Sequence, residues 1–419
     1  MSDSCAGKLA MAVSQQRLTD SLEYLASFGS TGDGGVNRQA LSEQDLQARQ
    51  WLVERAVSLG CSVFTDDCAN LFFRRAGTSD LPPVVTGSHI DTQPCGGKYD
   101  GCLGVMAGFE CLAALNDAGI STLRPIEVAI WMNEEGSRFS PGAMGSSAFV
   151  HPERLPLYLQ ATDADQVTLQ QALTDHHQAF PDLPHRAAIP MSAFLELHIE
   201  QGPVLENAGI TLGAVTGIQG VRWYQVVCEG SAAHAGTTPM HMRRDAMSLA
   251  IAATEQLRRL GDTLAGSELR ITFGRWQVEP NAINTIPSRV TFSVDFRHAD
   301  PAVLEAFDQQ LTECLPEYCQ ATAGFIHPPV QFPDTIVGTV TAACQALNQP
   351  FITLRSGAFH DAMYLAAHCP TGMIFVPSRD GISHNPAEFT EPADLTAGTR
   401  ILAWCLAELA NQSESPESL

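Results

Sequence analysis

The sequence predicts an α/β fold in which helices flank a central mixed sheet. Short apolar runs rich in β-branched residues, at residues 83–86, 126–132 and 193–199, alternate with helical stretches such as 103–115. This alternation is typical of a sheet covered by helices on both faces. The 419 residues are also enough for two or three domains, each with its own core.

The first helix beside this sheet is predicted at residues 46–59. Its apolar residues fall at helical spacing, Ser42 precedes it as a candidate N-cap, and Gly60 follows it as a stop. We expect a surface helix that packs one side against the sheet.

The middle of the chain has a different pattern. It combines three strand-like segments and one helical segment, at residues 223–227, 270–276, 289–297 and 245–259. After residue 329 the earlier alternation resumes. We therefore expect a catalytic domain made of residues 1–212 and 330–419, interrupted by an inserted, smaller α+β domain at residues 213–329.

Composition excludes several classes of protein. No apolar run approaches the roughly 18 residues of a membrane span, and 46 acidic against 24 basic side chains give a net charge of −22. A field of that sign repels nucleic acids and anionic membranes, so neither is expected as a partner.

Residues 1–17 lack the pattern of a secretion signal, and the 12 cysteines include no Cys-x-x-Cys pair. We expect reduced, mostly buried thiols and a cytoplasmic protein.

Polar clusters follow three of the predicted strands. They occupy residues 88–91, 133–136 and 198–201. Open α/β sheets bind ligands at the carboxyl ends of their strands, so these clusters are expected to converge on one site.

The first cluster contains His89, and Asp100 lies eleven positions later in a glycine-rich turn. A lone histidine or aspartate in a loop is more often a structural residue than a ligand. Asp91 favours the ligand hypothesis, because a metal-bound imidazole usually needs a carboxylate or carbonyl on its other nitrogen. Cys95, between them, is either a reactive thiol or a small residue tolerated in a turn.

The second cluster contains Glu134 and Glu135, directly after an apolar run. Adjacent acidic residues usually form a solvated turn. At the end of a buried strand, however, an extended backbone points successive side chains in opposite directions, so that one carboxylate can bind a metal while the other faces a water.

His198 and His384 add two imidazoles beside glycine and proline. Together with His89 and two carboxylates they form a mixed nitrogen and oxygen set that suits zinc, with manganese, cobalt or nickel as alternatives. Five ligands serve two metals well when one carboxylate bridges them. The sequence therefore predicts two divalent metal ions per subunit.

Five motifs together resemble the amidase/hydantoinase/carbamoylase branch of the dinuclear-zinc peptidases and aminoacylases. They are GSHIDT at 87–92, GGKYDG at 96–101, NEEG at 133–136, ELHIEQG at 196–202 and HAGTTP at 234–239. They occur in order, and the resemblance extends over residues 40–400.

The resemblance implies a role for each candidate. Asp100 would bridge the metals, His89 and His198 would complete one, and Glu135 and His384 the other. Glu134 would be the general base. The inserted domain would form a homodimer, in which His234 reaches the partner's site to stabilise the oxyanion.

The same matching implies four substrate-binding residues: Gln201, Asn284, Arg297 and His360. The planar fork of Arg297 suits a carboxylate. One position departs from the pattern, because the loop SGAFHD at 356–361 has Phe359 where the family often has glycine. That difference bears on substrate identity and not on the metal ligands.

A histidine at position 198, where peptidase relatives commonly carry a carboxylate, favours a small carboxylated carbamoyl or ureido substrate. The expected reaction converts an N-carbamoyl-L-amino acid and water to an L-amino acid, ammonia and carbon dioxide. Allantoate amidohydrolase is the alternative, as are ureidoglycolate and β-ureidopropionate hydrolases. The competing hypothesis of another class is an inactive, metal-stabilised dimer scaffold.

Overall fold

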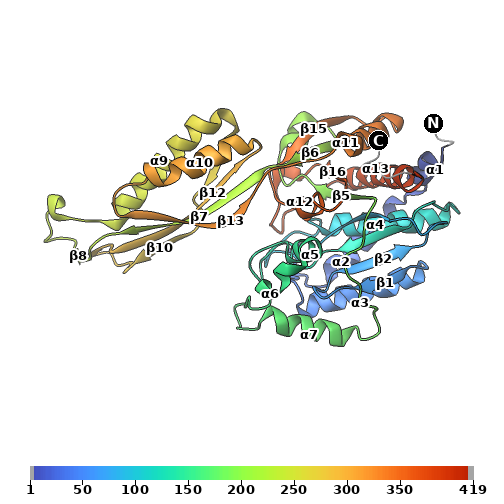
Figure 1. Ribbon diagram of the computed structural model, residues 1–419, viewed down its shortest axis with the longest axis horizontal. Coiled ribbons are helices and arrows are strands. Elements are labelled where there is room, and N and C mark those ends of the chain that lie inside the picture. Colours follow the sequence, from blue (N-terminus) through green and yellow to red (C-terminus); the bar gives the residue numbers. More distant parts are fainter. Residues whose placement is uncertain (1–3, 414–419) are drawn as a thin grey trace. The chain divides into compact units, whose positions relative to one another are not determined.

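The computed structural model describes residues 4–413 and has the predicted α/β fold (Figure 1). Residues 1–3 and 414–419, part of the expected first domain, lie outside the described residues. The chain divides into two compact units, one made of Met1–Gly217 and Phe332–Leu419 and the other of Ile218–Gln331. Within residues 4–413, no helix combines the length and apolarity needed to cross a membrane.

The first unit is built on a mixed sheet. In spatial order its strands are β1 (Ser62–Thr65), β2 (Leu71–Arg75), β4 (Ile126–Ile130), β3 (Val84–Ser88), β5 (Ala193–Ile199), β16 (Thr371–Val376) and β6 (Leu212–Ile218), and β15 (Phe351–Ser356) also pairs with β6. The neighbours β4, β3, β5 and β16 are parallel. The flanking pairings to β2 and β6 are antiparallel. The carboxyl ends of the four parallel strands therefore meet at one edge.

Helices cover both faces of this sheet. Those of the first unit are α1 (Cys5–Ala12), α2 (Gln15–Ser27), α3 (Glu43–Ser58), α4 (Cys102–Asp117), α5 (Met144–Val150), α6 (Leu155–Tyr158), α7 (Leu169–Ala179), α8 (Val204–Ala208), α11 (Asp334–Ala346), α12 (Ala362–Leu365) and α13 (Pro392–Ala410). On one face Leu195 joins a core with α4 and α13. On the other, Phe194 contacts Trp131, which contacts Phe149 of α5. Leu195 and Phe194, which are adjacent in β5, thus pack against helices on opposite faces of the sheet.

Helix α3 confirms the prediction at residues 46–59. The Ser42 side chain caps it by accepting the Asp45 N–H, and Gly60 follows its end with a φ of 81°. A buried ion pair, Arg49 Nε to Asp45 Oδ2 at 2.7 Å, joins successive turns.

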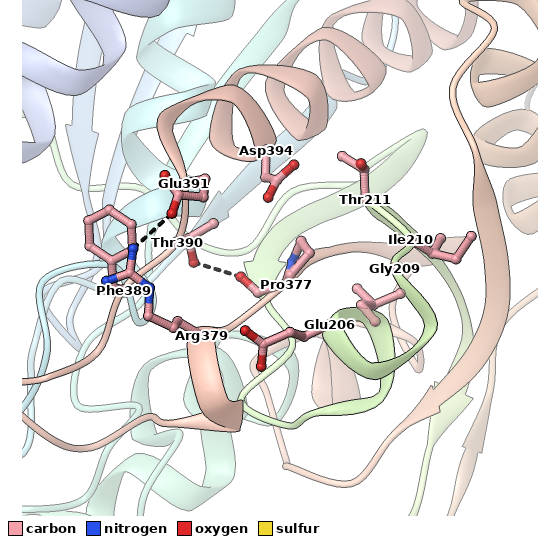
Figure 2. A pocket seen from close by; sticks show the side chains of 11 residues that line it. Glu206, Gly209, Ile210, Thr211, Pro377, Arg379, Phe389, Thr390, Glu391 and Asp394 are labelled. Atoms are coloured by element: carbon pink, nitrogen blue, oxygen red, sulfur yellow. Dashed lines mark hydrogen bonds and ion pairs between the residues drawn. The ribbon is translucent and has the colours of Figure 1, made fainter.

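After β16 the chain folds back on itself between Pro377 and Thr390 (Figure 2). The Thr390 hydroxyl donates to the Pro377 carbonyl at 2.8 Å, and the Arg379 guanidinium lies 3.8 Å from the centre of the Phe389 ring. Arg379 also pairs with Glu391. A cavity of about 270 Å³ borders these contacts.

The second unit is an antiparallel sheet with two helices on one face (Figure 1). Its strands and helices are β7 (Gly220–Glu229), β9 (Arg270–Thr272), β10 (Trp276–Glu279), β12 (Arg289–His298), β13 (Cys319–His327), α9 (Ala246–Ala265) and α10 (Pro301–Cys314). Outside this sheet, β8 (Ala233–His234) pairs with β11 (Thr285–Ile286), and the short strand β14 (Val330–Gln331) ends the unit. The sheet order is β10-β12-β7-β13, with β9 also paired to β12.

The predicted strand 270–276 is two strands, because residues 273–275 leave the ladder and include Gly274, which weakens a strand interior. The predicted strands at 223–227 and 289–297 are confirmed within β7 and β12. That this unit serves dimerisation stays a prediction.

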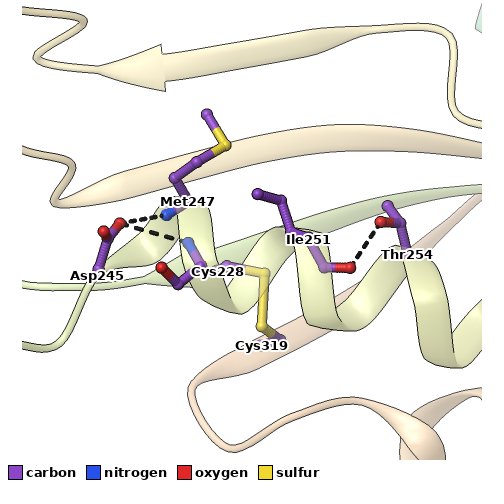
Figure 3. Close-up of a disulfide and its surroundings, with 7 residues drawn as sticks. Cys228, Asp245, Met247, Ile251, Thr254 and Cys319 are labelled. Carbon is purple, nitrogen blue, oxygen red and sulfur yellow. Dashed lines mark hydrogen bonds between the residues drawn. A yellow bond between two sulfur atoms is a disulfide. The ribbon is translucent and has the colours of Figure 1, made fainter. Parts of the chain in front are cut away.

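Cys228 and Cys319 form a disulfide beside helix α9 (Figure 3). They face each other in the register of β7 and β13, with Cα atoms 4.2 Å apart. The expectation of reduced thiols is wrong for this pair, because cross-strand register cannot be read from cysteines 91 positions apart. No second disulfide occurs among residues 4–413.

Candidate metal centre

The carboxyl edge of the parallel strands brings together six of the predicted site residues. Five of them lie at the ends of β3 and β4, on strand β5 itself and in the loop after β16, and the sixth lies in the turn before α4. The six residues are His89, Asp100, Glu134, Glu135, His198 and His384. Three of these strand ends were expected to converge, and β16 adds the fourth.

Asp100 belongs to two groups that could hold a metal ion. One group is His89, Asp100 and His198, and the other is Asp100, Glu135 and His384, with candidate ligand atoms within 4.8 Å of one another in each. Asp100 Oδ1 lies 3.2 Å from His198 Nε2 and 3.6 Å from His89 Nε2. The other oxygen, Oδ2, lies 3.2 Å from His384 Nε2. The two carboxylate oxygens therefore face different groups.

Backbone carbonyls orient two of the imidazoles. His89 Nδ1 lies 2.9 Å from the Asp91 carbonyl, and His198 Nδ1 lies 2.9 Å from the Ile199 carbonyl. A hydrogen on each Nδ1 leaves the Nε2 lone pair directed at the centre, as a metal ligand requires. His89 Nε2 is buried and has no hydrogen-bond partner among residues 4–413. The Nε2 of His198 accepts the Gly101 N–H at 3.1 Å.

Gly101 is required beside His89. Its φ is 66°, in the left-handed region that favours glycine, and an added Cβ would lie 2.4 Å from the imidazole ring. The glycine after Asp100 therefore lets the turn approach the first candidate ligand.

The carboxylates of Glu134 and Glu135 diverge. Glu134 Oε2 lies 3.5 Å from His89 Nε2, whereas Glu135 Oε2 lies 3.3 Å from His384 Nε2. The expected extended backbone is wrong, because β4 ends at Ile130 and Asn133 has a φ of 56°. This turn directs the two side chains apart.

Asp91 fixes that turn. Its two carboxylate oxygens accept the backbone N–H groups of Glu134 at 3.1 Å and Glu135 at 3.2 Å. The Asp91 carbonyl is the closer contact of His89 Nδ1, at 2.9 Å, and the carboxylate Oδ1 lies 3.7 Å from the same nitrogen. One residue thus orients an imidazole and the acidic pair.

The electrostatics of the site follow from burial and proximity. Burial raises the pKa of Glu134 well above its ordinary value, His89 partly offsets this, and Asp361 adds to it. Burial, with Asp100, raises the pKa of Glu135 to about 7. Burial also disfavours an ionised Asp100, but the neighbouring imidazoles outweigh it and hold the pKa of Asp100 well below its usual range. The centre therefore contains one firmly ionised carboxylate and two that hold protons readily.

Two predicted substrate residues lie beside the same centre. Gln201 Nε2 donates to Asp100 Oδ2 at 2.8 Å. His360 is buried, its ring centre is 4.5 Å from that of His198, and its Nε2 lies 3.0 Å from the Ser356 hydroxyl. In this structure both therefore contact residues of the centre.

The structure adds a buried residue that the sequence analysis missed, Glu196. It forms a third group with His198 and His360 that could hold a metal ion. The Ser88 hydroxyl donates to Glu196 Oε1 at 2.6 Å. Residues two apart in a strand share a face, so its position two before His198 was the available signal.

The remaining predicted residues belong to the second unit. His234 and Asn284 are both exposed. They lie side by side because β8 pairs with β11 and the Ala235 N–H donates to the Asn284 carbonyl at 3.0 Å. Arg297 lies on β12 and pairs with Asp295, with Nη2 2.7 Å from Oδ2. The arginine fork is therefore already oriented by a carboxylate two residues before it.

Comparison with known proteins gives the family. A model of peptidase family M20/M25/M40 matches residues 85–408. The N-carbamoyl-L-amino acid amidohydrolase of Geobacillus stearothermophilus is 36% identical over 419 residues, covering 94% of this chain and 98% of that protein. The allantoate amidohydrolase of Escherichia coli (strain K12) is also 36% identical, covering 95% of this chain and 98% of that protein.

A solved structure agrees with these relatives. The amidase of the hydantoinase/carbamoylase family from Burkholderia multivorans has a TM-score of 0.86 and 42% identity, covering 96% of this chain and 98% of that one. The resemblance inferred from the five motifs is confirmed. This chain belongs to peptidase family M20/M25/M40 and, within it, to the amidase, hydantoinase/carbamoylase branch.

Proposed function

We propose that this protein hydrolyses the ureido bond of N-carbamoyl-L-amino acids, releasing the amino acid, ammonia and carbon dioxide. The observation that carries the proposal is the pair of three-residue groups that share Asp100, with Glu134 beside them but in neither. That arrangement leaves one buried carboxylate free for proton transfer. Relatives named for carbamoyl and allantoate hydrolysis support a linear carbon–nitrogen bond as the target.

The proposed ligands are His89, Asp100 and His198 for one ion, and Asp100, Glu135 and His384 for the other. Zinc is our first expectation, with manganese, cobalt or nickel as alternatives. When bound, such ions acidify a water and polarise the carbonyl of the substrate. Imidazole Nε2 atoms and carboxylate oxygens that face one centre are the donors that this chemistry needs.

Glu134 is the proposed general base. It accepts the proton of the attacking water and then gives it to the leaving nitrogen. Burial raises the pKa of this carboxyl well above the usual value, which suits a group that must hold a proton between the two steps. His89 Nε2 lies 3.5 Å from Glu134 Oε2 and partly offsets this rise in pKa, which favours the ionised form of Glu134.

The second unit is proposed to complete the site in a homodimer. His234 is exposed in a single chain, so a second subunit can present it to a developing oxyanion. Asn284 lies beside it, and Arg297 is proposed to bind the substrate carboxylate. Gln201 and His360 are the proposed substrate contacts from the first unit.

Allantoate is the second candidate substrate. The two relatives named for the two activities are equally similar to this chain, each at 36% identity. The size of Phe359 bears on the choice between the two substrates. Its ring tip lies 2.8 Å from the position that a Cβ of Gly142 would occupy, and Gly142 belongs to the loop after Glu135. A ring at that position narrows the space beside the acidic pair.

The adjacent glutamates should behave differently. Glu134→Gln should retain two metals per chain while kcat falls by a factor on the order of 10² to 10⁴, as expected for loss of a general base. Glu135→Gln should lose one metal. Elemental analysis and kcat on proteins with unchanged circular dichroism check both, and interchanged phenotypes would show that the roles are reversed.

His234 should act across subunits. Mixing inactive Glu134→Gln subunits with inactive His234→Ala subunits should restore activity, because each heterodimer has one site with both residues intact. His241→Ala, at another exposed histidine of the same unit, is the matched control and should keep full activity. Verified heterodimers without activity would place His234 in its own subunit's site or outside catalysis.

Substrate choice tests the function itself. Ammonia release should be fastest with an N-carbamoyl-L-amino acid in a panel that includes N-carbamoyl-β-alanine, allantoate, ureidoglycolate and dipeptides. Arg297→Met should lower kcat/KM for the acid on the order of 10²-fold or more, because a charge-assisted contact in a desolvated site is lost.

The matched control is Arg270→Met, because Arg270 is the cross-strand partner of Arg297 on β9 and is exposed. It should leave kcat/KM unchanged. A preference for allantoate would change the substrate and keep the mechanism, whereas a preference for dipeptides would refute the proposed function.

A further inference from the structure

We propose that Glu388 is a positioning residue of this centre, whose buried carboxylate fixes Asp100 between the two candidate metal groups and ties it to the loop that carries His384. The inference rests on the proposed function, since it concerns the same site. Glu388 is four residues beyond His384 and is only 3% exposed.

The contacts of Glu388 reach both segments. Its Oε1 accepts the backbone N–H groups of Tyr99 at 2.9 Å and Asp100 at 3.1 Å. Its Oε2 lies 2.9 Å from the hydroxyl of Ser383, the residue before His384. One carboxylate therefore holds the backbone of the proposed bridging residue and the loop of another proposed ligand.

Ser383 extends this link to the Asp100 side chain. Its hydroxyl is 2.9 Å from Asp100 Oδ2 as well as 2.9 Å from Glu388 Oε2. A hydroxyl has one hydrogen, so it donates to one of the two carboxylates at a time. Asp100 Oδ2 is the oxygen that faces His384. Its orientation depends, through the Ser383 hydroxyl, on the position of the Glu388 carboxylate.

Gly97 gives independent support. An added Cβ at this position would lie 2.2 Å from the Oε1 and Cδ atoms of Glu388. Any side chain here would displace the carboxylate. The glycine-rich turn before Asp100 therefore has the shape that admits Glu388.

The loop that carries Glu388 is closed at its base. The Arg379 N–H donates to the Phe389 carbonyl at 2.9 Å, and the Thr390 hydroxyl donates to the Pro377 carbonyl (Figure 2). Gln201 N–H also donates to the Ser378 hydroxyl at 3.0 Å. Because both ends of the loop are fixed, the position of the Glu388 carboxylate is defined by the fold.

The same arrangement occurs once more in the centre. Asp91 accepts the N–H groups of Glu134 and Glu135, as Glu388 accepts those of Tyr99 and Asp100. Each carboxylate holds two successive amides of a turn that carries proposed metal ligands. Outer partners of this kind typically alter metal affinity by about 10- to 100-fold when replaced.

The test measures Co²⁺ binding by titration calorimetry and by visible absorption, on protein freed of metal. Glu388→Gln keeps an oxygen for the backbone amides but replaces Oε2 with a donor. Its affinity for the second Co²⁺ should fall by about 10- to 100-fold, and its Co²⁺ spectrum should change, while its urea midpoint stays at that of the unmodified protein. Glu391→Gln, an exposed carboxylate of the same segment, should change none of these.

Unaltered Co²⁺ affinity and spectrum in folded Glu388→Gln would overturn the proposal. If that variant does not fold, Ser383→Ala decides: a weaker second Co²⁺ supports the link to Asp100, and unchanged binding refutes it. A parent protein that binds fewer than two Co²⁺ or lacks ureido hydrolysis would instead refute the proposed function.

Discussion

The Asp100 carboxylate is the point on which the rest of the catalytic unit depends. Two imidazoles approach one of its oxygens and a third approaches the other. A buried carboxylate is strongly disfavoured unless hydrogen bonds or cations compensate it. Here the compensating groups come from the ends of β3 and β16 and from β5, so the order of the parallel strands must be in place before Asp100 can be accommodated. The fold and the site are therefore coupled.

The centre contains more carboxyl groups than imidazoles. Its carboxyl groups are Asp91, Asp100, Glu134, Glu135, Glu196, Asp361 and Glu388, all of them buried except Glu135, which is partly buried. Burial raises the pKa of Glu388, like that of Glu135, to about 7. The proposed divalent cations would compensate these carboxylates, and they would give the proposed anionic substrate a local positive potential on a chain whose net charge is −22.

Sequence patterns were sufficient to predict strands and candidate ligands where a polar motif directly follows an apolar run. The run at 126–132 predicted β4, and the structure brings the motif residues His89, Asp100, Glu135 and His198 together. The motif residue His234 lies in the second unit. Three features needed the fold. Glu196 lies in the motif at 196–202 but had no role assigned to it, Glu388 contacts amides nearly 290 positions away, and the Cys228–Cys319 pairing depends on strand register. Such features depend on long-range pairing, which local sequence does not encode.

The central claim is that one carboxylate, Asp100, bridges two ions. Anomalous diffraction from crystals of the metal-loaded protein tests it most directly. The account predicts two anomalous peaks about 3.5–4 Å apart, with one Asp100 oxygen on each, His89 and His198 at one peak, and Glu135 and His384 at the other. A single peak in fully loaded, active protein, or two peaks of which only one contacts Asp100, would contradict it.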